Sequence, residues 1–477
     1  MVEQSLKDKT VKGVVWSSVE RFSVQGVQFL VMLVIARILD PKDYGLVGML
    51  AIFLSISQTL VDSGFSQALI RKQDRTDMDC STVFYFNIVI SFILYIIFYL
   101  IAPWISNFFH ELQLTELMRV LSVVVFINSF AVVQRARLSA KINFKTLAKA
   151  SFFAAIVSGI AGIYMAYHEY GVWTLVYQQI LTAVINTIVL WILSPWRPKL
   201  MFSTESFRSL FAFGSKLMAS GLLDTLYKNL YQLIIGRYFS ATSLGFYSRA
   251  HHFSELPSSN ITGILQRVTY PVLCTIQGDD DRLRENYRKL LKLSAFIIFP
   301  LMSLLAGISY PLVEFFLGGK WLFAASLLIP LCFGMMWHPI HAINLNLLQV
   351  KGRTDLFLKL EIIKKVISVL LIAITIPFGV LAMCYMSILI SVICLFVNTY
   401  YTGKLINVGF LVQMMDLLPT LVVSTIMFAV VFFLSEIIQE NFINLFVGTI
   451  AGSSLYFSVA YIFKFEELSF ALSILKK

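Results

Sequence analysis

The sequence predicts an all-α integral membrane protein with about fourteen transmembrane helices, and three observations support this fold class. Of the 477 residues, 58% are hydrophobic and only 14% are charged, well below the charged share of about 25% in soluble domains. Apolar stretches of about 20 residues, the length that crosses a bilayer core, recur along the whole chain. Lysine and arginine gather in alternate connections between these stretches. Such a chain is covered by lipid over much of its surface.

Windows of the length of one membrane crossing divide the chain into two series of expected spans. The first series lies at 13–38, 44–68, 80–103, 115–137, 147–168 and 172–194. The second series follows at 207–238, 245–275, 292–316, 322–349, 356–376, 379–401, 412–435 and 442–463. The first stretch follows a basic segment, as the core of a signal peptide does. We expect a retained span instead, because the stretch is long, contains charged residues and lacks a small-residue cleavage site.

The distribution of positive charge predicts how the chain is oriented in the membrane. If the amino terminus is cytoplasmic, most lysines and arginines fall on the inner side. Four fall on the outer side: Arg37, Lys42, Arg237 and Lys320. This asymmetry follows the positive-inside rule only if the two least hydrophobic spans, 207–238 and 245–275, both cross. We therefore expect both termini in the cytoplasm, and a net charge of +11 that faces anionic lipids rather than nucleic acid.

The sequence contains no signature of a catalytic or metal centre. The connections are too short for a soluble catalytic domain, and the five cysteines lack disulfide or metal-ligand spacing. A phosphate-binding loop, an HExxH motif and a Gly-x-Ser-x-Gly elbow are all missing. His338 and His341 lie on either side of Pro339. We interpret them as interior histidines at a kink in the helix rather than as ligands of a metal ion. We expect a protein that is not an enzyme and that binds no cofactor or metal.

An internal repeat relates two parts of the chain at an offset of 200 residues. The stretch 35–45 parallels the stretch 235–245. In both, an arginine (Arg37 or Arg237) ends an outgoing helix and a glycine opens the returning one. Parallel repeats of this kind enclose a substrate site in many transporters. The alternative is that any two amphipathic hairpins look somewhat alike.

Four expected spans, two in each series, carry polar residues on one helical face. An ionisable residue at bilayer depth costs about 2.5–3.5 kcal/mol and usually faces a bundle interior or a wet cavity. The cations are candidates for binding a pyrophosphate or an acidic sugar: Arg21, Lys216, Lys228, Arg249 and Arg267. The acids are candidates for balancing these cations or carrying a coupling proton: Glu20, Asp62, Asp224 and Glu255. Alternatively, these charges form ion pairs that only fix helix register.

Four short motifs of the sequence are similar to those of a known protein family. They are GVVWSSVER at 13–21, ARILDPKDYGL at 36–46 and DSGF at 62–65 in the first half, and GFYSRA at 245–250 in the second. These motifs resemble the Wzx-type polysaccharide flippases, in particular the exporters of the colanic-acid type. The resemblance implies the fold of the multidrug/oligosaccharidyl-lipid/polysaccharide exporter superfamily, with two six-helix lobes in a V around a central cavity and two additional helices.

On this basis we expect three parts of the chain. Residues 1–200 form the N-terminal lobe with helices 1–6, and residues 201–405 form the C-terminal lobe with helices 7–12. Residues 406–477 contain the two additional transmembrane helices and a cytoplasmic tail.

The resemblance also implies a function. The substrate would be an undecaprenyl-pyrophosphate-linked oligosaccharide, moved by alternating access from the inner to the outer leaflet of the bacterial plasma membrane for O-antigen, capsule or exopolysaccharide synthesis. The protein would be surrounded by membrane lipids. Coupling to protons or sodium ions, and contacts with a polymerase or export proteins, are left as alternatives. A multidrug or metabolite antiporter and a flippase for lipid-linked peptidoglycan precursor are the alternatives. A membrane glycosyltransferase is disfavoured by the short outer connections.

Overall fold

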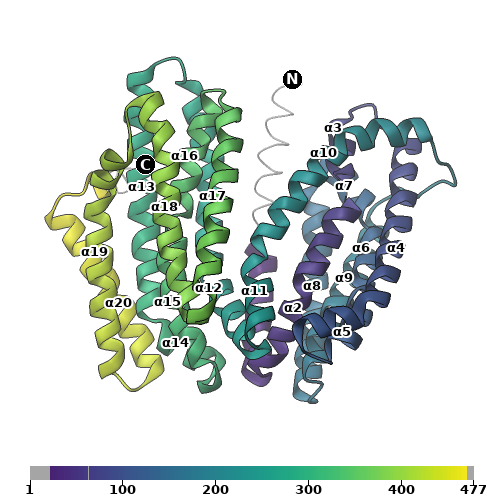
Figure 1. Cartoon of the computed structure of the whole chain (residues 1–477), viewed down its shortest axis with the longest axis horizontal. Helices are drawn as coiled ribbons and strands as arrows, with labels where there is room; N and C mark the ends of the chain where they lie inside the picture. Colours follow the sequence, from purple (N-terminus) through teal and green to yellow (C-terminus); the bar gives the residue numbers. More distant parts are fainter. Residues whose placement is uncertain (1–21, 63, 470–477) are drawn as a thin grey trace. The chain divides into compact units, whose positions relative to one another are not determined.

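The computed structural model describes residues 22–62 and 64–469, and these residues form helices joined by short connections (Figure 1). Nine helices in this part of the chain are long and apolar enough to cross a membrane, or ten if a bent pair counts as one span. Many large apolar side chains point outward, among them Trp104 and Leu411, which are each 75% exposed. The all-α membrane fold class is confirmed. The total of about fourteen crossings is compatible with these helices and stays a prediction.

The chain divides into two compact units, Met1–Gly245 and Phe246–Lys477. The first unit contains helix Phe22–Ile38 and then α2 (Pro41–Asp62), α3 (Phe65–Arg71), α4 (Asp77–Phe109), α5 (Leu114–Leu121), α6 (Val123–Ser129), α7 (Val132–Ala140), α8 (Phe144–Tyr167), α9 (Val172–Leu193), α10 (Thr204–Lys228), α11 (Leu230–Tyr238) and the start of α12 (Ala241–Thr275). The expected span 115–137 is bent by 40° where α7 begins. The expected span 207–238 is interrupted at Asn229, between α10 and α11.

The second unit contains the rest of α12 and the helices up to residue 462. These are α13 (Asp280–Gly307), α14 (Ser309–Leu317), η1 (Gly319–Trp321), α15 (Leu322–Met335), α16 (His338–Val350), α17 (Thr354–Thr375), η2 (Ile376–Phe378), α18 (Val380–Ile406), α19 (Phe410–Ile437) and α20 (Asn441–Ile462). Helix α16 begins at His338 with Pro339 in its first turn, a position where proline costs no hydrogen bond. The expected kink is therefore a junction between two helices.

One expected connection is helical. The stretch 276–291 was expected to be an inner loop, but α13 starts at Asp280 and continues without interruption into the apolar span. The side chain of Asp279 accepts a hydrogen bond from the backbone N–H of Arg282, which satisfies one of the free donors at the helix start. Hydropathy cannot detect such a helix, because its first turns are polar and lie beyond the apolar window.

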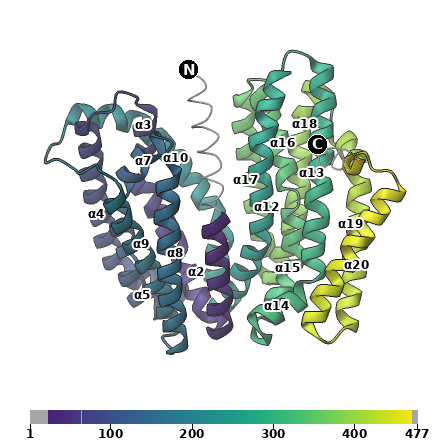
Figure 2. The ribbon, with the colours of Figure 1, turned by 180° about the vertical axis from the view of Figure 1, so that it is seen from behind.

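Helices α13 and α19 lie side by side (Figures 1 and 2), and polar side chains join them. Arg288 donates two hydrogen bonds of 2.7 Å to the carboxylate of Asp416. Deeper in the unit, the amide nitrogen of Gln413 lies 3.1 Å from the oxygen atoms of Tyr287, Asn344 and Thr402. Four helices, α13, α16, α18 and α19, thus share one buried polar network. Helix α19 is an integral part of the second unit.

Candidate functional site

The two copies of the repeat contact each other at the starts of α2 and α12. A Cβ atom on Gly45 would lie 1.6 Å from the carbonyl oxygen of Ala241, and one on Gly245 would lie 1.8 Å from the carbonyl oxygen of Pro41. Each glycine therefore packs on the first helical residue of the other copy. Such a reciprocal contact is the property of a two-fold relation. It supports the repeat found in the sequence.

Helix α10 carries three of the predicted site residues. Lys216 is exposed, whereas Asp224 and Lys228 form an ion pair with an N–O distance of 2.8 Å. With a rise of 1.5 Å per residue, Lys216 and Lys228 lie about 18 Å apart along the helix axis. The two cations therefore occupy different depths and do not form one ring. Two further predicted residues, Glu20 and Arg21, lie outside the described residues.

Helix α12 carries the predicted residues of the second unit. Arg249 is half-buried, while Glu255 and Arg267 are exposed. His251 Nδ1 lies 3.5 Å from Glu255 Oε2, so Glu255 has a partner that the sequence analysis missed. The four-residue spacing of these two side chains could have revealed it. Arg249 and Arg267 are about 27 Å apart along the helix, again at different depths.

Asp62 lies at a cavity of about 250 Å³ between α2, α3 and α10. The lining residues are Gln58, Thr59, Asp62, Gly64, Gln67, Leu217, Met218 and Gly221. One carboxylate oxygen of Asp62, Oδ1, is buried and has no hydrogen-bond partner among the described residues. The structure thus brings Asp62 together with neutral polar side chains, and none of the predicted cations is among the lining residues. Thr59 and Gln67 were missed because neutral polar residues stand out less in an apolar span than charges do.

The shape of this cavity follows from glycines at the helix contacts. Helix α2 ends at Asp62, and Gly64 has a left-handed backbone with φ of 68° before α3 begins. A Cβ on Gly64 would lie 2.5 Å from the carbonyl oxygen of Gly214 in α10. Further along α10, the hydroxyl oxygens of Thr59 and Thr225 lie 3.1 Å apart. The backbones of α3 and α10 thus meet closely, and the space beside this contact remains open.

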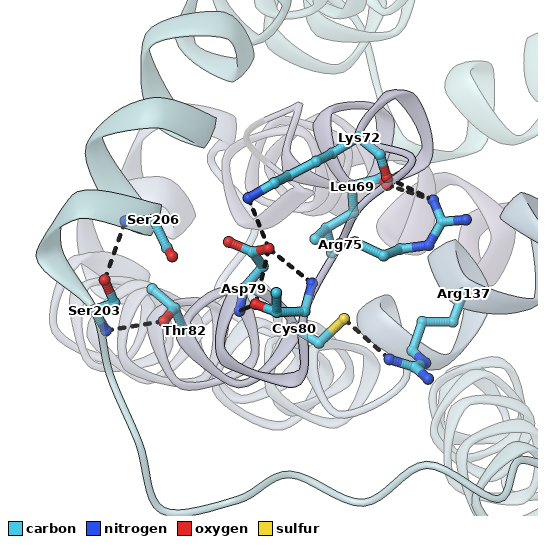
Figure 3. A network of polar contacts seen from close by, with 10 residues as sticks. Leu69, Lys72, Arg75, Asp79, Cys80, Thr82, Arg137, Ser203 and Ser206 are labelled. Atoms are coloured by element: carbon cyan, nitrogen blue, oxygen red, sulfur yellow. Dashed lines mark hydrogen bonds and ion pairs between the residues drawn. The ribbon is translucent and has the colours of Figure 1, made fainter.

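A separate polar network fixes the connection between α3 and α4 (Figure 3). Arg75 Nη1 donates to the carbonyl oxygens of Leu69 and Lys72 at 2.9 Å each, which caps the end of α3. Asp79 Oδ2 accepts hydrogen bonds from Thr76 N at 2.9 Å and lies 2.8 Å from Lys72 Nζ. The hydrogen bond to Asp79 raises the pKa of Lys72 above its ordinary value, so this lysine stays charged at neutral pH. These charges are paired with one another and stabilise the connection between α3 and α4.

Two further cations at this end of the unit are also paired. Arg137 Nη1 donates to Cys80 Sγ at 3.2 Å (Figure 3) and lies 3.6 Å from a carboxylate oxygen of Asp77. Lys199 Nζ lies 2.9 Å from the other oxygen of Asp77. The basic character that the sequence predicted for this side of the membrane therefore includes many charges that are engaged in structural contacts.

A buried polar cluster in the second unit was not predicted from the sequence. It lies between α16, α17 and α18. Lys364, with 11% of its side chain exposed, lies 2.5 Å from Glu361 Oε1. His341 Nδ1 lies 3.2 Å from Asn398 Nδ2. Across residues 22–62 and 64–469, no group of three His, Cys, Asp or Glu side chains is arranged to hold a metal ion.

Comparison with known proteins adds independent information. The profile of a family described as "polysaccharide biosynthesis protein" matches residues 34–326, more than half of the chain. Teichuronic acid biosynthesis protein TuaB of Bacillus subtilis is 25% identical over 355 residues, which cover 74% of this chain and 73% of TuaB. Lipopolysaccharide biosynthesis protein WzxC of Escherichia coli is 26% identical over 366 residues, covering 76% and 74% of the two chains.

Solved structures show the same fold. The lipid II flippase MurJ in an inward closed conformation is similar with a TM-score of 0.78 and 16% identity, over 94% of this chain and 98% of MurJ. An inward-facing multidrug resistance transporter of the MATE family has a TM-score of 0.62 and 18% identity, over 86% of this chain and 98% of the transporter. At these identities the similarity concerns the fold alone.

Proposed function

The chain belongs to the polysaccharide biosynthesis protein family, and from this premise we propose that it moves lipid-linked oligosaccharides from the inner to the outer leaflet of the bacterial plasma membrane. The family match carries this proposal, because it extends over both copies of the repeat, 35–45 and 235–245. The relatives TuaB and WzxC take part in the synthesis of teichuronic acid and lipopolysaccharide. Both products are surface polysaccharides. The substrate class proposed here is an oligosaccharide attached to undecaprenyl pyrophosphate.

The cations of α10 and α12 fit the transport of such a head group. A pyrophosphate needs charge-assisted hydrogen bonds wherever it leaves water. Lys216 and Lys228 offer cations at two depths of α10, and Arg249 and Arg267 do so on α12. The head group can therefore find a positive partner at more than one depth as it crosses. The lipid tail stays in the bilayer, and the two lobes, 1–200 and 201–405, alternate between inward-open and outward-open states.

The orientation in this proposal follows from the charge distribution, and the additional helices follow from the resemblance to the polysaccharide flippases. Both termini lie in the cytoplasm, and residues 406–477 add two transmembrane helices and a tail to the lobes. The protein acts as a transporter without a chemical reaction of its own. Glu20, Arg21, Asp224 and Glu255 complete the set of charges along the pathway, as partners of the cations or of the substrate.

Neutralising single cations tests this function. We expect Lys216→Gln and Arg249→Gln to reduce surface polysaccharide at least tenfold and to cause lipid-linked oligosaccharide to accumulate in the cell, at unchanged protein abundance. Lys216→Arg and Arg249→Lys keep the charge and should restore transport. Lys289→Gln serves as the matched control, because Lys289 is exposed and paired with Glu285 on the same helix.

Full polysaccharide levels in both neutralised variants would remove these residues from the pathway. Deletion of the whole protein separates the alternatives. A loss of drug resistance with intact polysaccharide would favour an antiporter, and loss of viability with a defect in cell-wall synthesis would favour the peptidoglycan precursor.

A further inference from the structure

We propose that the cavity beside Asp62 binds one alkali metal cation, sodium or potassium. The site is formed by α2 and α3 on one side and by α10 on the other. The proposal that an ion binds here rests on the structure of this cavity and not on the proposed transport function. The role of the ion, to couple its gradient to transport, deepens the proposed function and rests on it.

The chemistry of the lining residues suits a hard cation. Asp62 offers a carboxylate, Gln58 and Gln67 offer amide oxygens, and Thr59 offers a hydroxyl oxygen. Such oxygen donors are the ones that alkali and alkaline-earth ions prefer, and no histidine or cysteine is among the lining residues. The amide oxygen of Gln58 lies 3.4 Å from Asn128 Nδ2, which leaves a second lone pair for an ion.

The charge of the site selects a monovalent ion. Asp62 is the one ionisable side chain among the eight lining residues. A single carboxylate neutralises a single positive charge, whereas a divalent ion would leave a net charge at a depth where charge is costly. A cavity of about 250 Å³ has room for several water molecules at about 30 Å³ each. The ion can therefore keep part of its hydration shell.

The carboxylate of Asp62 lacks the cationic partner that the carboxylates of Asp416 and Asp79 have. Asp416 receives two hydrogen bonds from Arg288, and Asp79 is paired with Lys72. Asp62 has no such cation among the described residues. Its Oδ1 is buried without a donor, as is Oδ1 of Asp79, but Asp79 has a charged partner at its other oxygen. A buried carboxylate in this state is expensive unless a cation or a proton compensates it. The cavity beside it gives a metal ion access to the unpaired oxygen.

The interruption of the helix favours a cation at the same place. Helix α2 ends at Asp62 and α3 begins at Phe65. The last carbonyl groups of a helix lack intrahelical donors, and the negative end of the helix dipole attracts positive charge. An ion held here would also connect the junction to α10, which already touches it at Gly64 and Thr59.

The second copy of the repeat lacks the site. The counterpart of Asp62 is Thr262, whose hydroxyl donates to the carbonyl oxygen of Ser258 in its own helix at 2.7 Å. Helix α12 continues through this position without a break. The inference therefore predicts one ion per chain, not two.

Thermal unfolding of the purified full-length protein in lipid nanodiscs tests the site. Sodium, potassium and choline chlorides are compared at equal ionic strength and fixed pH. We expect sodium or potassium, but not choline, to raise Tm in a saturable way. Asp62→Asn should abolish this rise, and Gln67→Ala, at an exposed position where folding is not at risk, should weaken the apparent affinity about tenfold. Thr262→Val and Glu285→Gln are the matched controls and should show the same cation-dependent rise in Tm as the parent protein. Radioactive sodium or rubidium binding should give one ion per chain.

Three results would overturn the site: a Tm that is the same in all three salts, an equal salt response in the Asp62→Asn variant, or a response to pH alone, which would assign the cavity to a proton. The assay contains no oligosaccharide, so it separates the ion site from the proposed function. If the purified protein binds the ion but its deletion leaves surface polysaccharide intact, the proposed function is refuted and the ion site stands. Normal transport by Asp62→Asn would remove the coupling role.

Discussion

The two spans that the repeat relates, α2–α3 and α12, begin alike and then diverge. Both start with a glycine four residues into the helix that packs on the backbone of the other copy. Beyond that contact, the first copy is interrupted between Asp62 and Phe65, whereas α12 runs on as one helix to Thr275. The shared part is a close backbone contact that tolerates no side chain. The part that differs contains the carboxylate and the cavity, so the two copies share their packing contact and differ in their polar chemistry.

The shared contact predicts the largest effect on stability. Gly45→Ala and Gly245→Ala each place a methyl group within 1.6 and 1.8 Å of a carbonyl oxygen, so the backbone must move. We expect each to lower the free energy of unfolding by about 3 kcal/mol or more, measured by denaturation of the purified protein. Gly26→Ala is the control, because a Cβ there has no neighbour within 4 Å. A large loss in one variant and none in the other would contradict the reciprocal contact.

The interruption after Asp62 predicts an intermediate effect. Gly64→Ala combines a left-handed backbone at φ of 68° with a Cβ 2.5 Å from the carbonyl oxygen of Gly214. We expect a loss of about 2 kcal/mol in the same measurement. Ile264→Ala, at the corresponding position of α12, is half exposed and should cost less. If Gly64→Ala is as stable as the parent, the first copy can form a continuous helix as the second does.

The caps that follow the two copies predict the smallest effect. Thr76 forms a capping box with Asp79 at the start of α4, and Asp279 caps α13. Thr76→Ala and Asp279→Ala should each lower the free energy of unfolding by about 1 kcal/mol. Arg282→Ala, which removes a side chain but keeps the capped N–H, should cost less than Asp279→Ala. Arg282 Nε also lies 3.3 Å from Asp279 Oδ2, so equal losses for these last two would show that this ion pair rather than the cap stabilises α13.

Hydropathy predicted the all-α membrane fold class because burial in lipid depends on apolar length, which a sequence displays directly. It did not predict where helices extend into water or break. Helix α13 begins well before its apolar segment, and the break at Asn229 occurs inside a single expected span. Both features depend on capping and on contacts with other helices, which hydropathy does not measure.

The candidate site was predicted less completely than the fold. Asp62 was found because a carboxylate in an apolar span is conspicuous. Its neutral neighbours Thr59 and Gln67 were not, since they become meaningful only when α3 and α10 pack beside α2. The depth of Lys216 and Lys228 could have been derived from spacing alone, because α10 is one helix between them. Pairings such as Lys72 with Asp79 require the turn between α3 and α4.

The buried network around Gln413 has a consequence for biogenesis. Tyr287, Asn344 and Thr402 precede α19 in the chain and are synthesised before it. Until α19 is inserted, these side chains lack the amide that joins them, and Arg288 lacks the carboxylate of Asp416. The buried polar network of the second unit is therefore complete only once α19 has been synthesised and has packed against α13, α16 and α18.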